Sequence, residues 1–156
     1  MKLARVIRLD GSDLNVFPVA ADPGEWAISG AFEFADWTEA QLEGKPRQAF
    51  SNGWLGLGSF GRASFAAVCP ITRLELDALA DSLARHFIDR YGAPDRAAAD
   101  PVAAREIAQM REMCEDQDDN TLLTVARTLE QVGVRERFRV IAPQQASLAS
   151  FAVHGS

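Results

Sequence analysis

The expected fold depends most on one glycine-rich stretch, which reads Gly53-Trp54-Leu55-Gly56-Leu57-Gly58-Ser59-Phe60-Gly61-Arg62. Glycine adopts positive φ freely, so this stretch suits a tight and irregular crossover. The segment before it, residues 38–52, predicts a short helix interrupted by Gly44 and Pro46. The run after it, residues 62–71, predicts a strand. We therefore expect the stretch to feed a core strand, with Trp54 and Phe60 as packing residues.

Elsewhere in the chain, apolar alternation predicts strands at residues 2–9, 14–17, 26–34 and 134–141. Residues 121–129 fit either a strand or a helix. We choose a strand, because it would form a hairpin with residues 134–141.

Two amphipathic helices are expected downstream. Thr72 and Glu75 form a capping box ahead of a helix over residues 72–91, which Gly92 ends. Asp100 predicts the N-cap of a second helix over residues 100–115, with Pro101 in its first position. The fold class expected is α+β in two layers, with a mainly antiparallel sheet of five or six strands and both helices on one face.

The length and composition of the chain are typical of a single globular domain. The chain has 156 residues, 47% of them hydrophobic and 24% charged, with no internal repeat or linker composition. We expect residues 1–142 to form a single domain and residues 143–156 a C-terminal tail, partly disordered.

The formal net charge of −6 argues against a nucleic-acid or membrane-surface partner. Only Lys2 and Lys45 among the 16 basic residues are lysines, a bias typical of a GC-rich bacterial genome. Neither a signal peptide nor a membrane span is indicated, and Cys69 and Cys114 form no metal or disulfide motif, so we expect a cytoplasmic protein.

Residues 56–61 spell G-x-G-x-x-G, and residues 55–62 resemble the glycine-rich loop of a protein kinase. Dinucleotide binding would need a strand before the glycines and a helix after them, the reverse of the expected order. Kinase chemistry would need a downstream lysine and an Asp-Phe-Gly motif, and the sequence has neither. We expect no cofactor.

Other catalytic or metal patterns are incomplete. Residues 116–127 begin like a calcium loop but place Thr121 and Arg127 where glycine and glutamate are required. His86 is expected on a solvated helix face. No metal site and no catalytic residue are predicted, although an unrecognised enzyme stays open as a second alternative.

Two groups of residues remain candidates for binding a ligand or a partner. One is in the glycine-rich loop. The other is a row of arginines on one side of the last strand. Arginine binds carboxylate and phosphate groups well, so the row could bind an anion or a partner. The alternative is that the row is a solvated face that balances acidic residues on neighbouring strands. The candidate ligand- or partner-binding residues are Trp54, Ser59, Phe60, Arg62, Arg135, Arg137 and Arg139.

The whole chain also resembles a family of small uncharacterised bacterial proteins. The resemblance rests on Arg8-Leu9-Asp10, Asp13-Leu14-Asn15-Val16-Phe17, Phe50-x-Asn52-Gly53, Leu55-Gly56, Ser59-Phe60-Gly61-Arg62 and Val134-Arg135-Glu136-Arg137-Phe138. It implies no activity and no catalytic residue. The function we expect is that of a non-catalytic accessory or protein-interaction domain, with a protein partner or self-association, as in a homodimer. The first alternative is a binder of a small anionic ligand at the loop 53–62.

Overall fold

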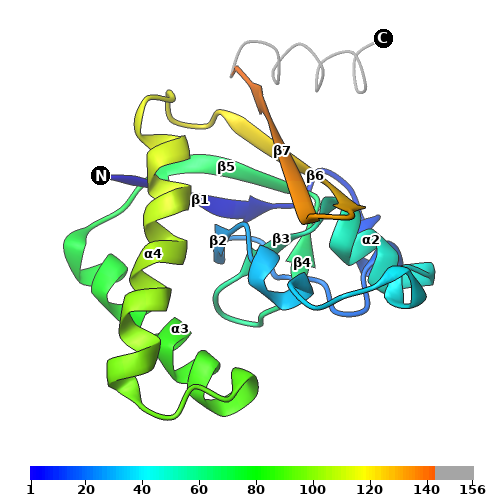
Figure 1. Ribbon diagram of the computed structural model, residues 1–156. Helices are drawn as coiled ribbons and strands as arrows, with labels where there is room; N and C mark the ends of the chain where they lie inside the picture. The colour runs from blue at the N-terminus through cyan, green and yellow to red at the C-terminus, as the bar shows by residue number, and fades with distance from the viewer. Residues whose placement is uncertain (143–156) are drawn as a thin grey trace, which may run out of the picture.

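A single antiparallel sheet organises residues 1–142, the part of the chain that the computed structural model describes (Figure 1). Its strand order is β4-β3-β2-β1-β5-β6-β7, and the sheet is curled. The strands are β1 (Lys2–Ile7), β2 (Trp26–Ile28), β3 (Trp54–Gly56), β4 (Arg62–Ala63), β5 (Phe65–Pro70), β6 (Leu122–Glu130) and β7 (Gly133–Ile141). The α+β class and the antiparallel sheet are as predicted.

The count of five or six strands was too low. The glycine-rich stretch, expected as a crossover, forms the short strand β3 and a turn that leads into β4. The expected strand at 62–71 is divided at Ser64 into β4 and β5. The sheet therefore has seven strands, although one of the six predicted strands is absent.

That absent strand is residues 14–17, which form most of the short helix α1 (Asp13–Val16). The Asp10 carboxylate accepts a hydrogen bond from the Ser12 amide at 2.8 Å and turns the chain before it can extend. The Asp13 carboxylate then accepts from the Ser64 hydroxyl at 2.8 Å, which holds α1 against the β4–β5 junction.

The strand predicted at 26–34 was too long. Gly30 takes a φ of 69°, so β2 ends at Ile28 and a 3-10 helix follows at Ala31–Phe34. The turn sends two aromatic residues of the alternating pattern into different clusters. Phe32 packs edge-on against Phe87 with ring centroids 4.8 Å apart, whereas Phe34 joins a small core with Phe50.

Within residues 1–142 four helices complete the fold, where two main helices were predicted. Besides α1 they are α2 (Gly44–Asn52), α3 (Arg73–Tyr91) and α4 (Arg96–Glu115), and a 3-10 turn at Glu39–Gln41 precedes α2. The capping box of α3 is present, since the Glu75 amide donates to the Thr72 hydroxyl at 3.1 Å. The two long helices pack side by side, and α4 crosses β1 and β2 (Figure 1).

Helix α4 begins earlier than predicted. Its N-cap is Asp95, whose carboxylate accepts from the Ala98 amide at 2.9 Å, and Asp100 lies inside the helix. Pro101 is therefore in the second turn, where its missing N–H removes one helical hydrogen bond. An earlier cap offsets this loss with an additional helical turn.

The predicted hairpin at the end of the sheet is confirmed. Strands β6 and β7 pair without a break from Leu122 opposite Ile141 to Glu130 opposite Gly133. In residues 1–142, β7 pairs with β6 alone and is the edge of the sheet. The predicted tail at 143–156 lies outside the described residues.

Candidate functional site

The turn between β3 and β4 holds a carboxylate of the protein itself. Glu25 Oε1 accepts hydrogen bonds from the amides of Gly58 at 2.8 Å and Ser59 at 2.6 Å. Glu25 Oε2 accepts from the Ser59 hydroxyl at 2.8 Å and also from the Asp22 amide. A phosphate loop presents its amides to a bound anion in the same manner. Here the anion is a side chain.

The remaining amides of the turn are also used within the protein. Phe60 donates to the Gly56 carbonyl at 3.0 Å, Gly61 donates to the Ser59 hydroxyl at 3.0 Å, and Arg62 donates to the Val19 carbonyl at 2.9 Å. Every amide from Gly58 to Arg62 thus has an internal acceptor. An external anion at this turn would have to displace Glu25.

The glycines make this close approach sterically feasible. A Cβ on Gly56 would lie 2.7 Å from Glu25 Oε1, and one on Gly61 would lie 2.7 Å from the Ala20 carbonyl carbon. Real Cβ atoms do not approach other atoms so closely. The G-x-G-x-x-G spacing therefore reflects the packing of the segment that contains Ala20 and Glu25 against the turn.

The bonds around Glu25 determine its protonation. Burial raises the pKa of this carboxyl group, but the donors from Ser59, Asp22 and Gly58 outweigh that effect and hold the pKa below its ordinary value. Glu25 is consequently a carboxylate near neutral pH. It stabilises the turn through charge-assisted hydrogen bonds.

Trp54 and Phe60, two of the candidate binding residues, pack against distant elements. Trp54 is fully buried, donates from Nε1 to the Leu123 carbonyl at 3.0 Å and stacks on Phe138. Phe60 stacks on His86 of α3 with ring centroids 3.7 Å apart. The prediction that His86 is solvated was wrong: it is partly buried, and burial lowers its pKa.

Arg62 lies inside the molecule at only 3% exposure. Its guanidinium donates to the carbonyls of Ser29, Gly30 and Gly53 at 2.9–3.1 Å and pairs with Glu33 at 2.7 Å. Burial lowers its pKa, and the charge of Glu33 partly offsets this. The side chain ties β4 to the end of β2 and the end of α2.

A second arginine completes this buried cluster. Arg127 of β6 donates to the carbonyls of Phe50 at 3.0 Å, Gly53 at 2.9 Å and Ser29 at 2.6 Å, and its Nε pairs with Glu136 at 2.8 Å. Burial, together with the nearby Arg62, lowers its pKa to about 10. Both arginines share the Ser29 and Gly53 carbonyls, so they hold three parts of the sheet together.

The predicted arginine row is on the surface. Arg135, Arg137 and Arg139 are exposed on one side of β7. Opposite them on β6 lie only uncharged residues, in the pairs Thr128 with Arg135, Ala126 with Arg137 and Thr124 with Arg139. Glu130 of β6 pairs with Arg135 at 3.5 Å, whereas Arg137 and Arg139 form no ion pair within residues 1–142. Strands β3 and β7 are far apart in the strand order, but Trp54 of the loop 53–62 stacks on Phe138. The loop therefore meets β7 on the face opposite the arginine row and not at the arginines themselves.

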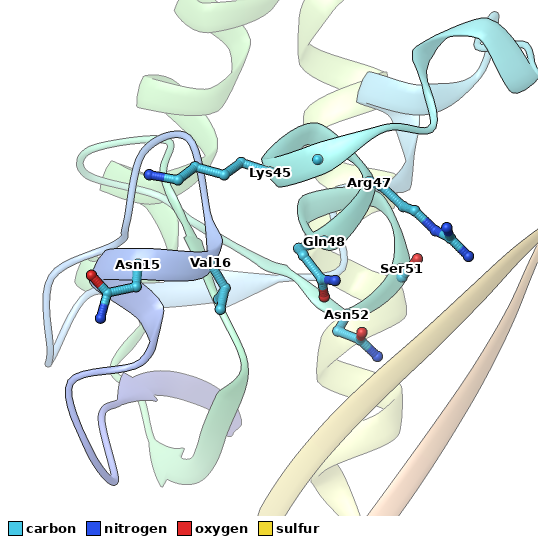
Figure 2. A pocket seen from close by; sticks show the side chains of 8 residues that line it. Asn15, Val16, Lys45, Arg47, Gln48, Ser51 and Asn52 are labelled. Atoms are coloured by element: carbon cyan, nitrogen blue, oxygen red, sulfur yellow. The ribbon is translucent and has the colours of Figure 1, made fainter.

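A polar pocket of about 620 Å³ lies between α1 and α2 (Figure 2). Its cations do not converge, since Lys45 extends toward the side of Asn15 while Arg47 points to the opposite side. The lining residues are Asn15, Val16, Gly44, Lys45, Arg47, Gln48, Ser51 and Asn52. Nothing in this arrangement singles out one ligand.

A second cleft, of about 500 Å³, lies between α4 and β7. Its walls combine methionine and phenylalanine side chains with carboxylates. The lining residues are Ser29, Gln109, Met110, Glu112, Met113, Glu136 and Phe138. One side of β7 thus faces this cleft, while the arginine row is on its other side.

Within residues 1–142, no three His, Cys, Asp or Glu side chains are grouped so that they could hold a metal ion. Cys114 is fully buried, and burial raises the pKa of its thiol to about 12. Such a thiol is a packing group and not a nucleophile near neutral pH. In the same range, no helix is both long and apolar enough to cross a membrane.

Two groups of the site, the partly exposed Glu25 and the buried Arg127, were not recognised in the sequence. Glu25 follows an ordinary Pro-Gly turn signal, and only its contact with a turn more than thirty residues away reveals its role. Arg127 lies in the segment that fitted both helix and strand. Its place opposite Glu136 becomes visible only when the hairpin register is known.

Comparison with known proteins assigns the chain to a family. The sequence profile of a Family of unknown function (DUF6505) matches residues 1–156, and the chain belongs to that family. No curated protein and no solved structure matched the chain.

Proposed function

We propose that this chain is a non-catalytic accessory protein that binds an extended, acidic segment of a partner protein along β7. The observation that carries the proposal is the combination of an edge position with an exposed arginine row. An edge strand offers backbone donors and acceptors to an added strand. Alternate residues of such a strand would meet Arg135, Arg137 and Arg139, which lie about 7 Å apart along β7.

The charge pattern favours carboxylates on the partner. Arg135 has one exposed ion pair, with Glu130 at 3.5 Å, whereas Arg137 and Arg139 form none within residues 1–142. The row is thus locally positive on a protein whose net charge is −6. Arginine binds carboxylates through two parallel hydrogen bonds, so the row suits Glu or Asp at alternate positions.

A second copy of the chain fits the same edge less well. Two-fold antiparallel pairing of β7 with itself places residues of one face opposite residues of the same face. With the two-fold axis at Arg137, Arg137 would face Arg137 and Arg135 would face Arg139, and like charges directly opposite are destabilising. We therefore propose a different protein as the partner, and a homodimer becomes the competing outcome.

The alternative of a small anionic ligand at the loop 53–62 has less support. Its amides already bind internal acceptors, and Glu25 would have to leave before an anion could enter.

The composition also favours a bacterial cytoplasm as the setting for the partner-binding role.

The test is binding of a labelled peptide as long as β7, with Glu at alternate positions, measured by fluorescence anisotropy. We expect binding of this peptide and none of its Lys counterpart. The double variant Arg137→Glu/Arg139→Glu should weaken binding by about tenfold or more, because it replaces two attractions by repulsions. Arg47→Glu, an exposed arginine on α2, is the matched control and should have little effect.

Equal weakening by Arg47→Glu would show that only overall charge matters and would overturn the proposal. So would absence of peptide binding. Sedimentation of the unmodified protein as a dimer, dissociated by a proline in β7, would instead establish the second copy as the occupant.

A further inference from the structure

The cleft between α4 and β7 has the size and the mixed walls of a small-molecule site. Its volume of about 500 Å³ falls in the range of ligand pockets. Met110 is almost fully buried at its base, Met113 is partly exposed, and Phe138 is 43% exposed. The Phe138 ring is fixed from behind, since it stacks on the buried Trp54 at 5.7 Å with an angle of 15° between ring planes.

The polar part of the cleft carries negative charge that the protein only partly balances. Glu136 accepts hydrogen bonds from Ser29 and from Arg127, and both reach the same oxygen, Oε2. Among residues 1–142, no hydrogen bond or ion pair reaches Glu136 Oε1. The Glu136 side chain is 22% exposed whereas that of Arg127 is 0% exposed, so the carboxylate and not the guanidinium faces the cleft.

Two further carboxylates lie near Glu136, one in the wall of the cleft and one beside the residues that line it. Glu112 lines the cleft at its exposed rim. Glu106 is one helical turn before Met110 and is therefore on the same side of α4. Burial raises the pKa of Glu106, the charge of Glu136 raises it further, and only the neighbouring Arg105 acts against this. Glu136 thus makes ionisation of Glu106 less favourable, an effect that a bound cation would oppose.

We propose that this cleft binds a small organic cation, a primary or quaternary ammonium group on a short apolar body. The ammonium group would lie between Glu136 and Glu106. The apolar body would contact the two methionines, whose flexible side chains adapt to ligand shape, and the exposed face of Phe138, which attracts cations through its π system. This site is separate from the arginine row, which is on the other face of β7.

The test uses hexylammonium as the probe, with hexanol and hexanoate as ligands of the same length but different charge. Isothermal titration calorimetry should show that hexylammonium binds about tenfold or more tightly than hexanol, and that hexanoate does not bind. Methyl resonances of Met110 and Met113 should shift during the titration.

Glu106→Gln should weaken hexylammonium binding about fivefold or more, because it removes a charge from the cleft without breaking a hydrogen bond of the fold. Phe138→Ala is the second variant and should also weaken binding. Glu115→Gln, at the end of α4, is the matched control. Equal affinity for hexylammonium and hexanol, or binding that neither variant weakens, would overturn the inference.

The outcomes are independent of the proposed partner binding. Glu106→Gln should leave the Glu peptide bound as before, and Arg137→Glu/Arg139→Glu should leave hexylammonium binding unchanged. Failure of one site therefore does not imply failure of the other.

Discussion

Glu25 has the role in the glycine-rich turn that a bound anion has in a phosphate loop. Two amides and a hydroxyl of the turn converge on its carboxylate at 2.6–2.8 Å. The sequence motif is therefore informative about local geometry, because it identifies a turn that binds an anion. It is misleading about the ligand, since the chain supplies that anion from a neighbouring loop.

Glu25→Gln should lower the free energy of unfolding by about 1–2 kcal/mol at neutral pH, because the amides would lose a charged acceptor. The folded-state pKa of Glu25 is below its unfolded value. Its contribution is therefore present above the unfolded pKa of about 4.3 and is lost as the pH falls through the folded value. Urea unfolding at several pH values should show the difference between the two proteins shrinking in acid.

Glu43→Gln is the matched control, since Glu43 is exposed and its side chain makes no capping hydrogen bond. If Glu25→Gln were no more destabilising than this control at neutral pH, the internal-anion interpretation of the turn would be wrong.

Arg127 should be among the most sensitive positions of the fold. Arg127→Met would leave Glu136 and several buried carbonyl groups without their donor, and loss of one partner of a buried ion pair costs about 3–5 kcal/mol. Arg139→Met, on the exposed face of β7, should change stability by less than about 0.5 kcal/mol. Chemical denaturation of both variants gives the comparison. Similar small effects would contradict the structural role of the arginine cluster.

Among the elements, the start of α4 differs between sequence and structure. The sequence predicts Asp100 as its N-cap, whereas the structure has Asp95 there. Asp95→Ala should destabilise the protein by about 1 kcal/mol, because it removes the hydrogen bond to the Ala98 amide. Asp100→Ala removes only a surface ion pair with Arg96, at 2.7 Å, and should cost about 0.3–0.5 kcal/mol. Thermal unfolding of the two variants distinguishes these positions, and the reverse order would restore Asp100 as the cap.

Elements with a local signal were predictable from the sequence. The capping box gave the start of α3, and the paired patterns at 121–129 and 134–141 gave the β6–β7 hairpin. Elements that depend on distant contacts were not. The alternation after Trp26 continues through Phe34, but the left-handed Gly30 ends β2 because Phe32 and Phe34 pack into separate clusters.

For the whole molecule, the sequence predicted some of the residues of the candidate site but not how they are arranged in space. Trp54 and Phe60 were expected to pack, and both do so. Arg62 proved to be an internal tie, because the carbonyl groups that it binds come from segments that only the tertiary fold brings together. The exposure of the arginine row followed from strand alternation alone, whereas the edge position of β7 required the strand order.

We propose that the two faces of β7 form two separate surfaces for recognition. Its arginine face lies beside threonine and alanine residues of β6, which suits an added strand. Its other face borders the cleft beneath α4, which suits a small cation. Trp54, from the glycine-rich stretch that first suggested a ligand site, stacks on Phe138 of β7 from within the fold.

The central claim is that recognition takes place along β7 and not at the glycine-rich turn. The most direct measurement is residue-resolved NMR of the protein during titration with the Glu peptide, together with amide hydrogen exchange in the complex. We predict that shifts and new protection concentrate at residues 133–141 and that the amides of residues 58–62 stay unchanged. Shifts centred on residues 58–62, with β7 unaffected, would contradict the account.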